Sequence, residues 1–244
     1  EAVERARAEV ALLLGCAADE VFFTSGATES NNLAIRGAAE AQKERRHVVT
    51  SAVEHPAVAV PCGWLEAHGW DVTRVGVDAE GRASLEGLAR AVGERTALVT
   101  LMHANNETGV LQPVGEAARI AREHGALVHT DAAQSVGKVR LEVDALGVDL
   151  LSVAGHKLYA PKGVGALYVR RGTPVRPFML GAGHEGGLRP GTENVASIVG
   201  LGAACAAALR DLDEEAARQG ALRDLLWSRL LAAVPGLARN GHPT

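Results

Sequence analysis

The chain has few of the residues that build disulfide frameworks, metal clusters or aromatic-rich surfaces. Only three of its 244 residues are cysteines, at positions 16, 62 and 205, and aromatic residues make up 3% of the chain. Three scattered cysteines are too few for a disulfide framework or a thiolate metal cluster. None of the nine histidines lies at metal-ligand spacing beside a matching cysteine or carboxylate set, so we expect no metal site.

An excess of basic charge and long apolar runs are also missing. Lys and Arg total 25 against 29 Asp and Glu, for a net charge of −4, so nothing indicates a nucleic-acid partner. No uninterrupted apolar stretch is long enough to span a bilayer, and no charged-then-apolar leader opens the chain. We therefore expect no membrane partner and a cytoplasmic location. With 47% hydrophobic residues, a chain of this length can bury a large core.

Helical and strand patterns alternate along the chain, which is typical of an α/β fold with a largely parallel sheet. The predicted strands cover residues 21–24, 47–51, 71–77, 97–103, 126–130, 148–153 and 164–169. The predicted helices cover residues 1–14, 28–43, 56–68, 84–92, 113–124 and about 194–234. There is no internal repeat and no low-complexity linker, so the pattern predicts one continuous sheet flanked by helices.

An acid and a lysine follow two of the predicted strands. Asp131 comes directly after the apolar run 126–130 and opens the sequence Asp-Ala-Ala-Gln, and Lys157 follows the run 148–153 within Gly-His-Lys. Open α/β sheets bind ligands at the carboxyl ends of their strands, so the two side chains are expected to converge. Pyridoxal 5'-phosphate needs such a pair: an amine for a Schiff base, and a carboxylate that keeps the ring nitrogen protonated. The alternative is a surface lysine and an ordinary strand-end aspartate, and the Gly-His-Lys sequence taken alone favours that alternative.

A small-residue turn between an aromatic strand and a helix is the third element of this pattern. The sequence runs Phe22-Phe-Thr-Ser-Gly-Ala-Thr28. Free N–H groups at a helix start, with glycine permitting close approach and a threonine hydroxyl adding a donor, form an anion site that suits a phosphate. Ser25 or Thr28 as a simple N-cap is the alternative, and both interpretations can hold because capping geometry also presents donors.

Six motifs, in order and spacing, resemble the class V branch of fold-type I pyridoxal phosphate enzymes, and within it the cysteine desulfurase and selenocysteine lyase family. They are Thr24-Ser-Gly-Ala-Thr-Glu-Ser30, Glu54-His55, His103-Ala-Asn-Asn-Glu-Thr-Gly109, Asp131-Ala-Ala-Gln134, Gly155-His-Lys-Leu-Tyr-Ala-Pro-Lys-Gly163 and Arg189-Pro-Gly-Thr-Glu-Asn194. The resemblance implies a three-layer large domain with a mostly parallel mixed sheet. Residues 1–210 would form this domain without its N-terminal segment, and residues 211–244 a connecting helix and the start of a truncated C-terminal small domain.

The resemblance also implies roles for individual residues. Lys157 would be the Schiff-base lysine and proton shuttle, and His55 would stack on the pyridine ring and act as acid or base. The cofactor's other contacts would be Asp131 to the ring nitrogen, Gln134 to the phenolic oxygen, Asn106 to the cofactor or substrate, and Gly26, Ala27, Thr28, His156 and Thr192 to the phosphate. Thr192 would reach across from a second subunit, which implies a homodimer. Ala154 stands where many relatives have serine, so one hydroxyl donor is missing.

The implied activity is that of a cysteine desulfurase, which takes sulfur from L-cysteine to give L-alanine and an enzyme persulfide. The sulfur would pass through an acceptor or scaffold protein to iron–sulfur cluster or thiocofactor synthesis. We expect the persulfide-forming cysteine and the substrate-carboxylate arginine of the family beyond Thr244, because Cys16, Cys62 and Cys205 read as small buried residues. Alternatives are a selenocysteine lyase, another class V aminotransferase or kynureninase-like enzyme, and a non-catalytic scaffold with this fold.

Overall fold

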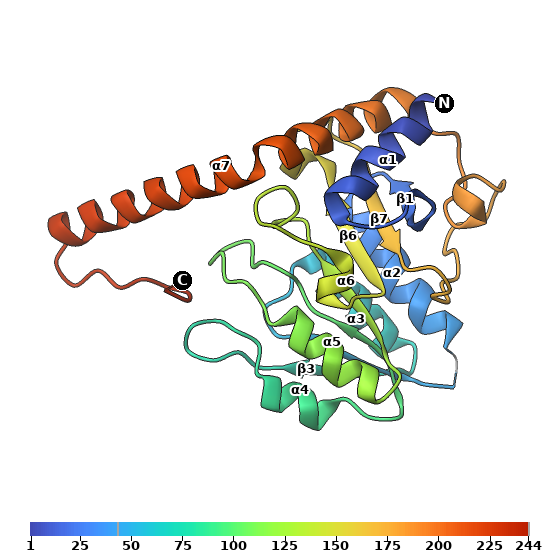
Figure 1. Ribbon diagram of the computed structural model, residues 1–244. Coiled ribbons are helices and arrows are strands. Elements are labelled where there is room, and N and C mark those ends of the chain that lie inside the picture. Colours follow the sequence, from blue (N-terminus) through green and yellow to red (C-terminus); the bar gives the residue numbers. More distant parts are fainter. Residues whose placement is uncertain (43, 244) are drawn as a thin grey trace.

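A seven-stranded sheet with helices on both faces forms the centre of the protein (Figure 1). The structure, a computed structural model, describes residues 1–42 and 44–243. The strands are β1 (Val21–Thr24), β2 (His47–Ser51), β3 (Asp71–Val75), β4 (Thr96–Thr100), β5 (Leu127–Asp131), β6 (Leu150–Ala154) and β7 (Gly165–Val169). Their order in the sheet is β1-β7-β6-β5-β4-β2-β3. Every pair is parallel except the two that β7 makes, so the predicted mostly parallel mixed sheet is confirmed.

The single reversed strand decides which loops share an edge of the sheet. Because β7 runs against both β6 and β1, β1 points in the same direction as the parallel strands. The carboxyl ends of β1, β2, β4, β5 and β6 therefore meet at one edge. The turn after β1 and the segments that follow the other four strands all leave the sheet there.

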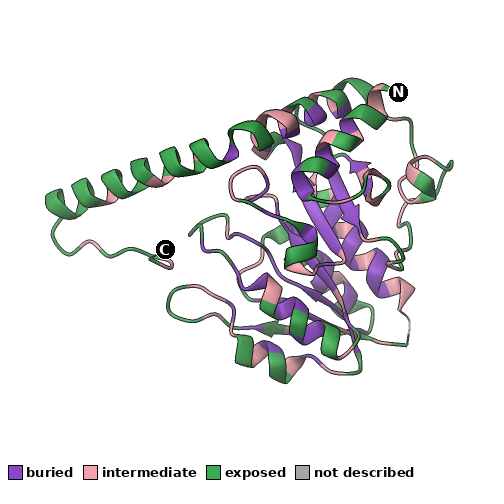
Figure 2. Ribbon diagram, in the orientation of Figure 1, coloured by how far each residue is buried: buried purple, intermediate pink, exposed green. Residues whose placement is uncertain are grey.

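Helices cover the two faces of the sheet in separate groups. Helices α2 (Ala27–Ala41) and α3 (Pro56–Ala67) contribute apolar side chains to the core on one face. On the other face lie α1 (Ala2–Leu14), α4 (Leu85–Ala91), α5 (Val114–Glu123), α6 (Val143–Leu146) and the first part of α7 (Val195–Ala233). Figure 2 shows the buried strands between them. The expected three-layer architecture is therefore present.

Element bounds follow the sequence patterns closely, with a few differences. Strands β1 and β2 have the predicted residues, whereas the patterns at 71–77 and 97–103 end early, at Val75 and Thr100. Helix α2 ends at Ala41, and residue 43, the predicted end, lies outside the described residues. The sequence pattern does not predict α6 or the 3₁₀ helices η1 (Ala18–Glu20), η2 (Gly155–Leu158) and η3 (Glu185–Gly187), because three or four residues are too few to show helical periodicity.

Helix α7 packs on the domain over only part of its length. Its buried residues, Ile198, Leu201, Gly202, Cys205 and Leu212, all lie in its first half, and the second half extends away from the sheet with exposed side chains (Figures 1 and 2). Among the described residues, α7 is the one helix long and apolar enough to cross a membrane by length and composition. The sequence contains no uninterrupted apolar run of this length, because Arg210 and Asp211 interrupt the apolar pattern. A helix in the core of a soluble protein meets the same length and composition criteria, so these two criteria alone are weak evidence for a membrane span.

Candidate cofactor site

A cavity of about 430 Å³ lies where the carboxyl ends of the parallel strands meet. This volume is within the range of small-molecule sites, roughly 300–1,000 Å³. Nine of the ten predicted site residues line it: Gly26, Ala27, Thr28, His55, Asn106, Asp131, Gln134, His156 and Lys157. The tenth, Thr192, is exposed and lines a different, smaller cavity beside Thr24 and Ser25. The fold thus gathers residues from five separate segments around one hollow.

The turn between β1 and α2 has the geometry that an anion site requires. Gly26 is the N-cap of α2 and has a φ of 150°, and no side chain caps the helix. The first N–H groups of α2 are therefore not taken by a cap, and they are free to bind an anion. Neither Ser25 nor Thr28 is the N-cap. The turn also lies directly on β7, because a Cβ on Gly165 would come within 2.6 Å of the Gly26 Cα.

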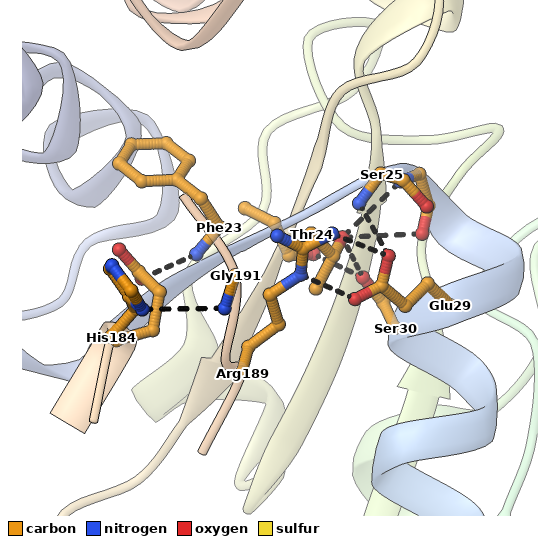
Figure 3. Close-up of polar contacts among 11 residues, drawn as sticks. Phe23, Thr24, Ser25, Glu29, Ser30, His184, Arg189 and Gly191 are labelled. Atoms are coloured by element: carbon orange, nitrogen blue, oxygen red, sulfur yellow. Dashed lines mark hydrogen bonds and ion pairs between the residues drawn. The ribbon is translucent and has the colours of Figure 1, made fainter. Parts of the chain in front are cut away.

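An ion pair fixes this turn to the segment that carries Thr192 (Figure 3). Glu29 accepts the Ser25 N–H through Oε2 at 2.8 Å, and Arg189 donates from Nε to Glu29 Oε1, also at 2.8 Å. Burial acts to raise the pKa of Glu29, but hydrogen bonds from Arg189 and Ser25 together hold it below its usual value. The sequence motifs contain both residues but do not reveal that they bind each other, because 160 residues separate them.

A second buried ion pair anchors the glycine-rich loop that precedes Arg189. Arg7 of α1 donates from both terminal nitrogens to the Glu185 carboxylate, at 2.8 and 2.9 Å, and from one of them to the Val21 carbonyl at 2.7 Å. Glu185 also accepts the Phe23 N–H at 2.7 Å. Its φ of 49° is unfavourable for a residue with a Cβ, so these bonds hold a strained position.

Asp131 ends β5 with its carboxylate held on both oxygens. The Ala133 N–H donates to Oδ1 at 2.9 Å, and the side chain of Asn31 on α2 donates from Nδ2 to Oδ2 at 2.7 Å. Burial raises the pKa of Asp131, while these two hydrogen bonds and the nearby His55 act to lower it. Asn31 is fully buried and does not line the cavity. The sequence gives no sign of the Asn31–Asp131 contact, which joins residues 100 positions apart.

His55 and Glu54 occupy the segment between β2 and α3. His55 is the N-cap of α3, and its Nδ1 accepts the Ala57 N–H at 3.1 Å, so the neutral imidazole carries its proton on Nε2. Glu54 accepts from Ser51 Oγ at 2.6 Å and from the Met102 N–H at 3.0 Å, which ties the end of β2 to the end of β4. Burial raises the pKa of Glu54 to about 8.

Lys157 lies in η2, immediately after β6, with the exposed His156 before it. A second lysine, Lys138, donates to Gln134 Oε1 at 3.3 Å. The pKa of Lys138 is lowered by burial and by the positive charge of Lys157. Two amines thus lie near the cavity, and only Lys157 lines it.

Two neighbouring asparagines have different roles, because one lines the cavity and the other shapes a turn. Asn106 is exposed and lines the cavity. The neighbouring Asn105 accepts the N–H groups of Glu107 and Thr108, both at 2.9 Å. Asn105 therefore organises the turn.

The three cysteines lie outside this cavity. Cys62 and Cys205 are buried, as predicted, whereas Cys16 is half-buried. Burial raises the pKa of each thiol to about 12, so none is ionised at neutral pH. No group of three or more His, Cys, Asp or Glu side chains that could hold a metal ion occurs in the part of the chain that the structure describes.

Comparison with known proteins agrees with this geometry. Residues 1–243 match the family described as aminotransferase class-V. The chain belongs to this family. Cysteine desulfurase IscS of Dictyoglomus turgidum is 45% identical over 241 residues, which are 98% of this chain and 61% of that protein. The chain thus spans less than two thirds of the length of this relative.

Solved structures resemble the protein at a similar level of sequence identity. A structure described as a NifS-like protein superimposes with a TM-score of 0.92 at 43% identity, covering 95% of this chain and 64% of the other. A structure of SspA in complex with cysteine gives a TM-score of 0.80 at 45% identity, covering 84% of this chain and 60% of that one. These likenesses confirm the fold-type I large domain and the predicted family.

The residues of the cavity fit pyridoxal phosphate, the cofactor of this family. An uncapped helix start suits its phosphate, a lysine lines the same cavity, and a buried carboxylate held by two donors suits a protonated ring nitrogen. Ala154 lines the cavity without offering a hydroxyl, as expected from the sequence.

Proposed function

We propose that the longer protein to which this chain belongs is a pyridoxal phosphate-dependent cysteine desulfurase. The observation that carries the proposal is that Lys157 and Asp131 line one cavity together with the N-terminus of α2. The names of the relatives support the reaction, and the SspA structure in complex with cysteine supports L-cysteine as the substrate.

Each side chain has a distinct task in this proposal. When bound, pyridoxal phosphate supplies an electron sink for the charge left at the substrate Cα. Lys157 would hold the cofactor covalently, and its free amine would move the Cα proton of the substrate. Asp131 keeps the ring nitrogen protonated, and the N–H groups of the Gly26–Thr28 turn bind the phosphate. His55 lies over the same cavity with a proton on Nε2, where it can donate to substrate or cofactor.

The persulfide-forming thiol is proposed to come from a cysteine other than Cys16, Cys62 and Cys205, since all three have raised pKa values and lie outside the cavity. A homodimer in which Thr192 donates to the partner's phosphate, a sulfur-acceptor protein and a cytoplasmic location belong to the same proposal. So does the division into a large domain at 1–210 and a connecting region at 211–244. The exposed position of Thr192 supports the dimer.

The test is to measure L-alanine formed from L-cysteine by the full-length protein, with selenocysteine as the competing substrate. Borohydride reduction should fix the cofactor to the peptide that contains Lys157. Lys138→Arg is the matched control, because Lys138 is the neighbouring amine and this change should leave the labelling intact. Label on Lys138 would refute the assignment of Lys157, and a strong preference for selenocysteine would indicate a selenocysteine lyase.

A further inference from the structure

We propose that Asn31 is a positioning residue that orients the Asp131 carboxylate toward the cofactor's ring nitrogen and keeps it ionised. This inference rests on the proposed function. The contact that carries it is the 2.7 Å hydrogen bond from Asn31 Nδ2 to Asp131 Oδ2, made between two buried side chains. Hydrogen bonds to ionised acceptors are stronger than those between neutral groups.

The orientation of the Asn31 amide is fixed by its neighbour. If the amide were reversed, its carbonyl oxygen would face a carboxylate oxygen, and two acceptors repel each other. In the observed orientation Asn31 Oδ1 is buried and has no hydrogen-bond partner among the described residues. Buried polar atoms are nearly always paired, so one that is not calls for an explanation. Asn31 leaves one acceptor unpaired in order to present a donor to Asp131.

Helix α2 thereby serves two ends of one site. Ala27, at the N-terminal turn, and Asn31 are four residues apart and so share a face of the helix, about 6 Å apart along its axis. The first turn offers N–H groups to an anion, and the second offers a donor to the carboxylate. The other support of Asp131 is the Ala133 N–H, which is a backbone group and does not depend on the side chain at that position. Asn31 is therefore the side chain on which the orientation of Asp131 depends.

The experiment uses the full-length protein loaded with pyridoxal phosphate that carries ¹⁵N in its ring. The ¹⁵N chemical shift distinguishes a protonated from a neutral ring nitrogen. Asn31→Leu keeps the branched shape of the Asn side chain but has no donor, and it should move the signal from the pyridinium toward the neutral position. Exchange of the substrate Cα proton with solvent should slow by about ten- to hundredfold, the range expected for loss of a hydrogen bond to a charged group.

The control is Asn32→Ala on the same helix. Asn32 is half-buried and donates to the Thr28 carbonyl at 2.9 Å, away from Asp131, so its replacement should leave the ¹⁵N signal unchanged. A purely structural role of Asn31 would lower the melting temperature of Asn31→Leu and leave the ring nitrogen protonated. If Asn31→Leu does not fold, the smaller Asn31→Ala, which also has no side-chain donor, gives the same readout.

The two proposals fail in different ways. A folded Asn31 variant whose bound cofactor keeps the wild-type ¹⁵N shift refutes the role of Asn31 and leaves the proposed function intact. A wild-type protein that binds no pyridoxal phosphate refutes the proposed function, and the role of Asn31 with it.

Discussion

Replacing Arg7 should destabilise the protein far more than replacing an arginine whose ion pair is equally short but exposed. In the Arg7–Glu185 pair the N–O distance is 2.8 Å, and 12% and 3% of the two side chains are exposed. The Arg7 guanidinium also lies 4.8 Å from the centre of the Phe23 ring. Arg7→Met keeps most of the aliphatic stem over this ring but leaves the Glu185 carboxylate buried without its partner. Removing one partner of a buried pair costs about 3–5 kcal/mol.

Arg95 and Asp71 provide the matched control. Their N–O distance is also 2.8 Å, but 73% and 64% of the side chains are exposed. Exposed pairs contribute about 0–1 kcal/mol, so Arg95→Met should have little effect on the free energy of unfolding. Both variants are compared with wild type by urea denaturation. A change in the midpoint at an unchanged m-value reports a change in the free energy of unfolding.

Adding Glu185→Gln to Arg7→Met should recover part of the loss. The neutral amide no longer buries a charge, and its oxygen can still accept the Phe23 N–H. Two results would show that burial does not govern these pairs: an Arg7→Met loss within about 1 kcal/mol of the Arg95→Met loss, or a double variant less stable than Arg7→Met alone.

Three further results are expected. Asp131→Asn should fold with little loss of stability, because the Asn31 amide can reverse and pair its free Oδ1 with the new NH₂ group. The exchange of the substrate Cα proton should nevertheless slow at least about a hundredfold, and an unchanged rate would contradict the role of Asp131. Alanine substitution of Cys16, Cys62 or Cys205 should leave the turnover of L-cysteine by the full-length protein within about twofold, and loss of persulfide in any one of them would identify a nucleophile that we exclude. Burial lowers the pKa of His129 from 6.5 to about 3, so below pH 6.5 the unfolded chain binds a proton that the folded protein does not. The free energy of unfolding should therefore fall as the pH is lowered from 6.5 toward 3, by up to about 1.4 kcal/mol per pH unit. Urea denaturation at a series of pH values measures this slope, and His129→Gln should remove the part that His129 contributes.

The sequence predicted the site better than it predicted the contacts that support the site. Asp131 and Lys157 could be placed because each follows a short apolar run, and strand ends in a parallel sheet converge without any knowledge of the loops. The turn at Gly26 could be placed because its small residues stand between a strand pattern and a helix pattern. The N-cap was wrong by one or two residues, since Ser25 and Thr28 have the usual capping side chains and the helix uses Gly26 instead.

The supporting contacts join residues that no local pattern connects. Arg7 and Glu185 are 178 positions apart, and Asn31 and Asp131 are 100 apart. Periodicity shows which face of an element is buried, but it does not show which polar residue of another element meets it there. Thr192 is different in kind, because the role predicted for it needs a second subunit. That role stays a prediction.

The pairing of β1 with β7 has a consequence for synthesis on the ribosome. Among the described strands, β1, which leads into the phosphate turn, has β7 as its only neighbour in the sheet, and Thr24 pairs with Gly165. At roughly 5–20 residues per second, the ribosome completes β7 about 7 to 30 seconds after it has made the turn. Until then the turn has no β7 to pack on, and β6, which leads into the Lys157 segment, has no neighbouring strand on its β7 side. We therefore expect the nascent chain to bind its cofactor late in synthesis. A shortage of pyridoxal phosphate would affect the protein only after most of the domain has been made.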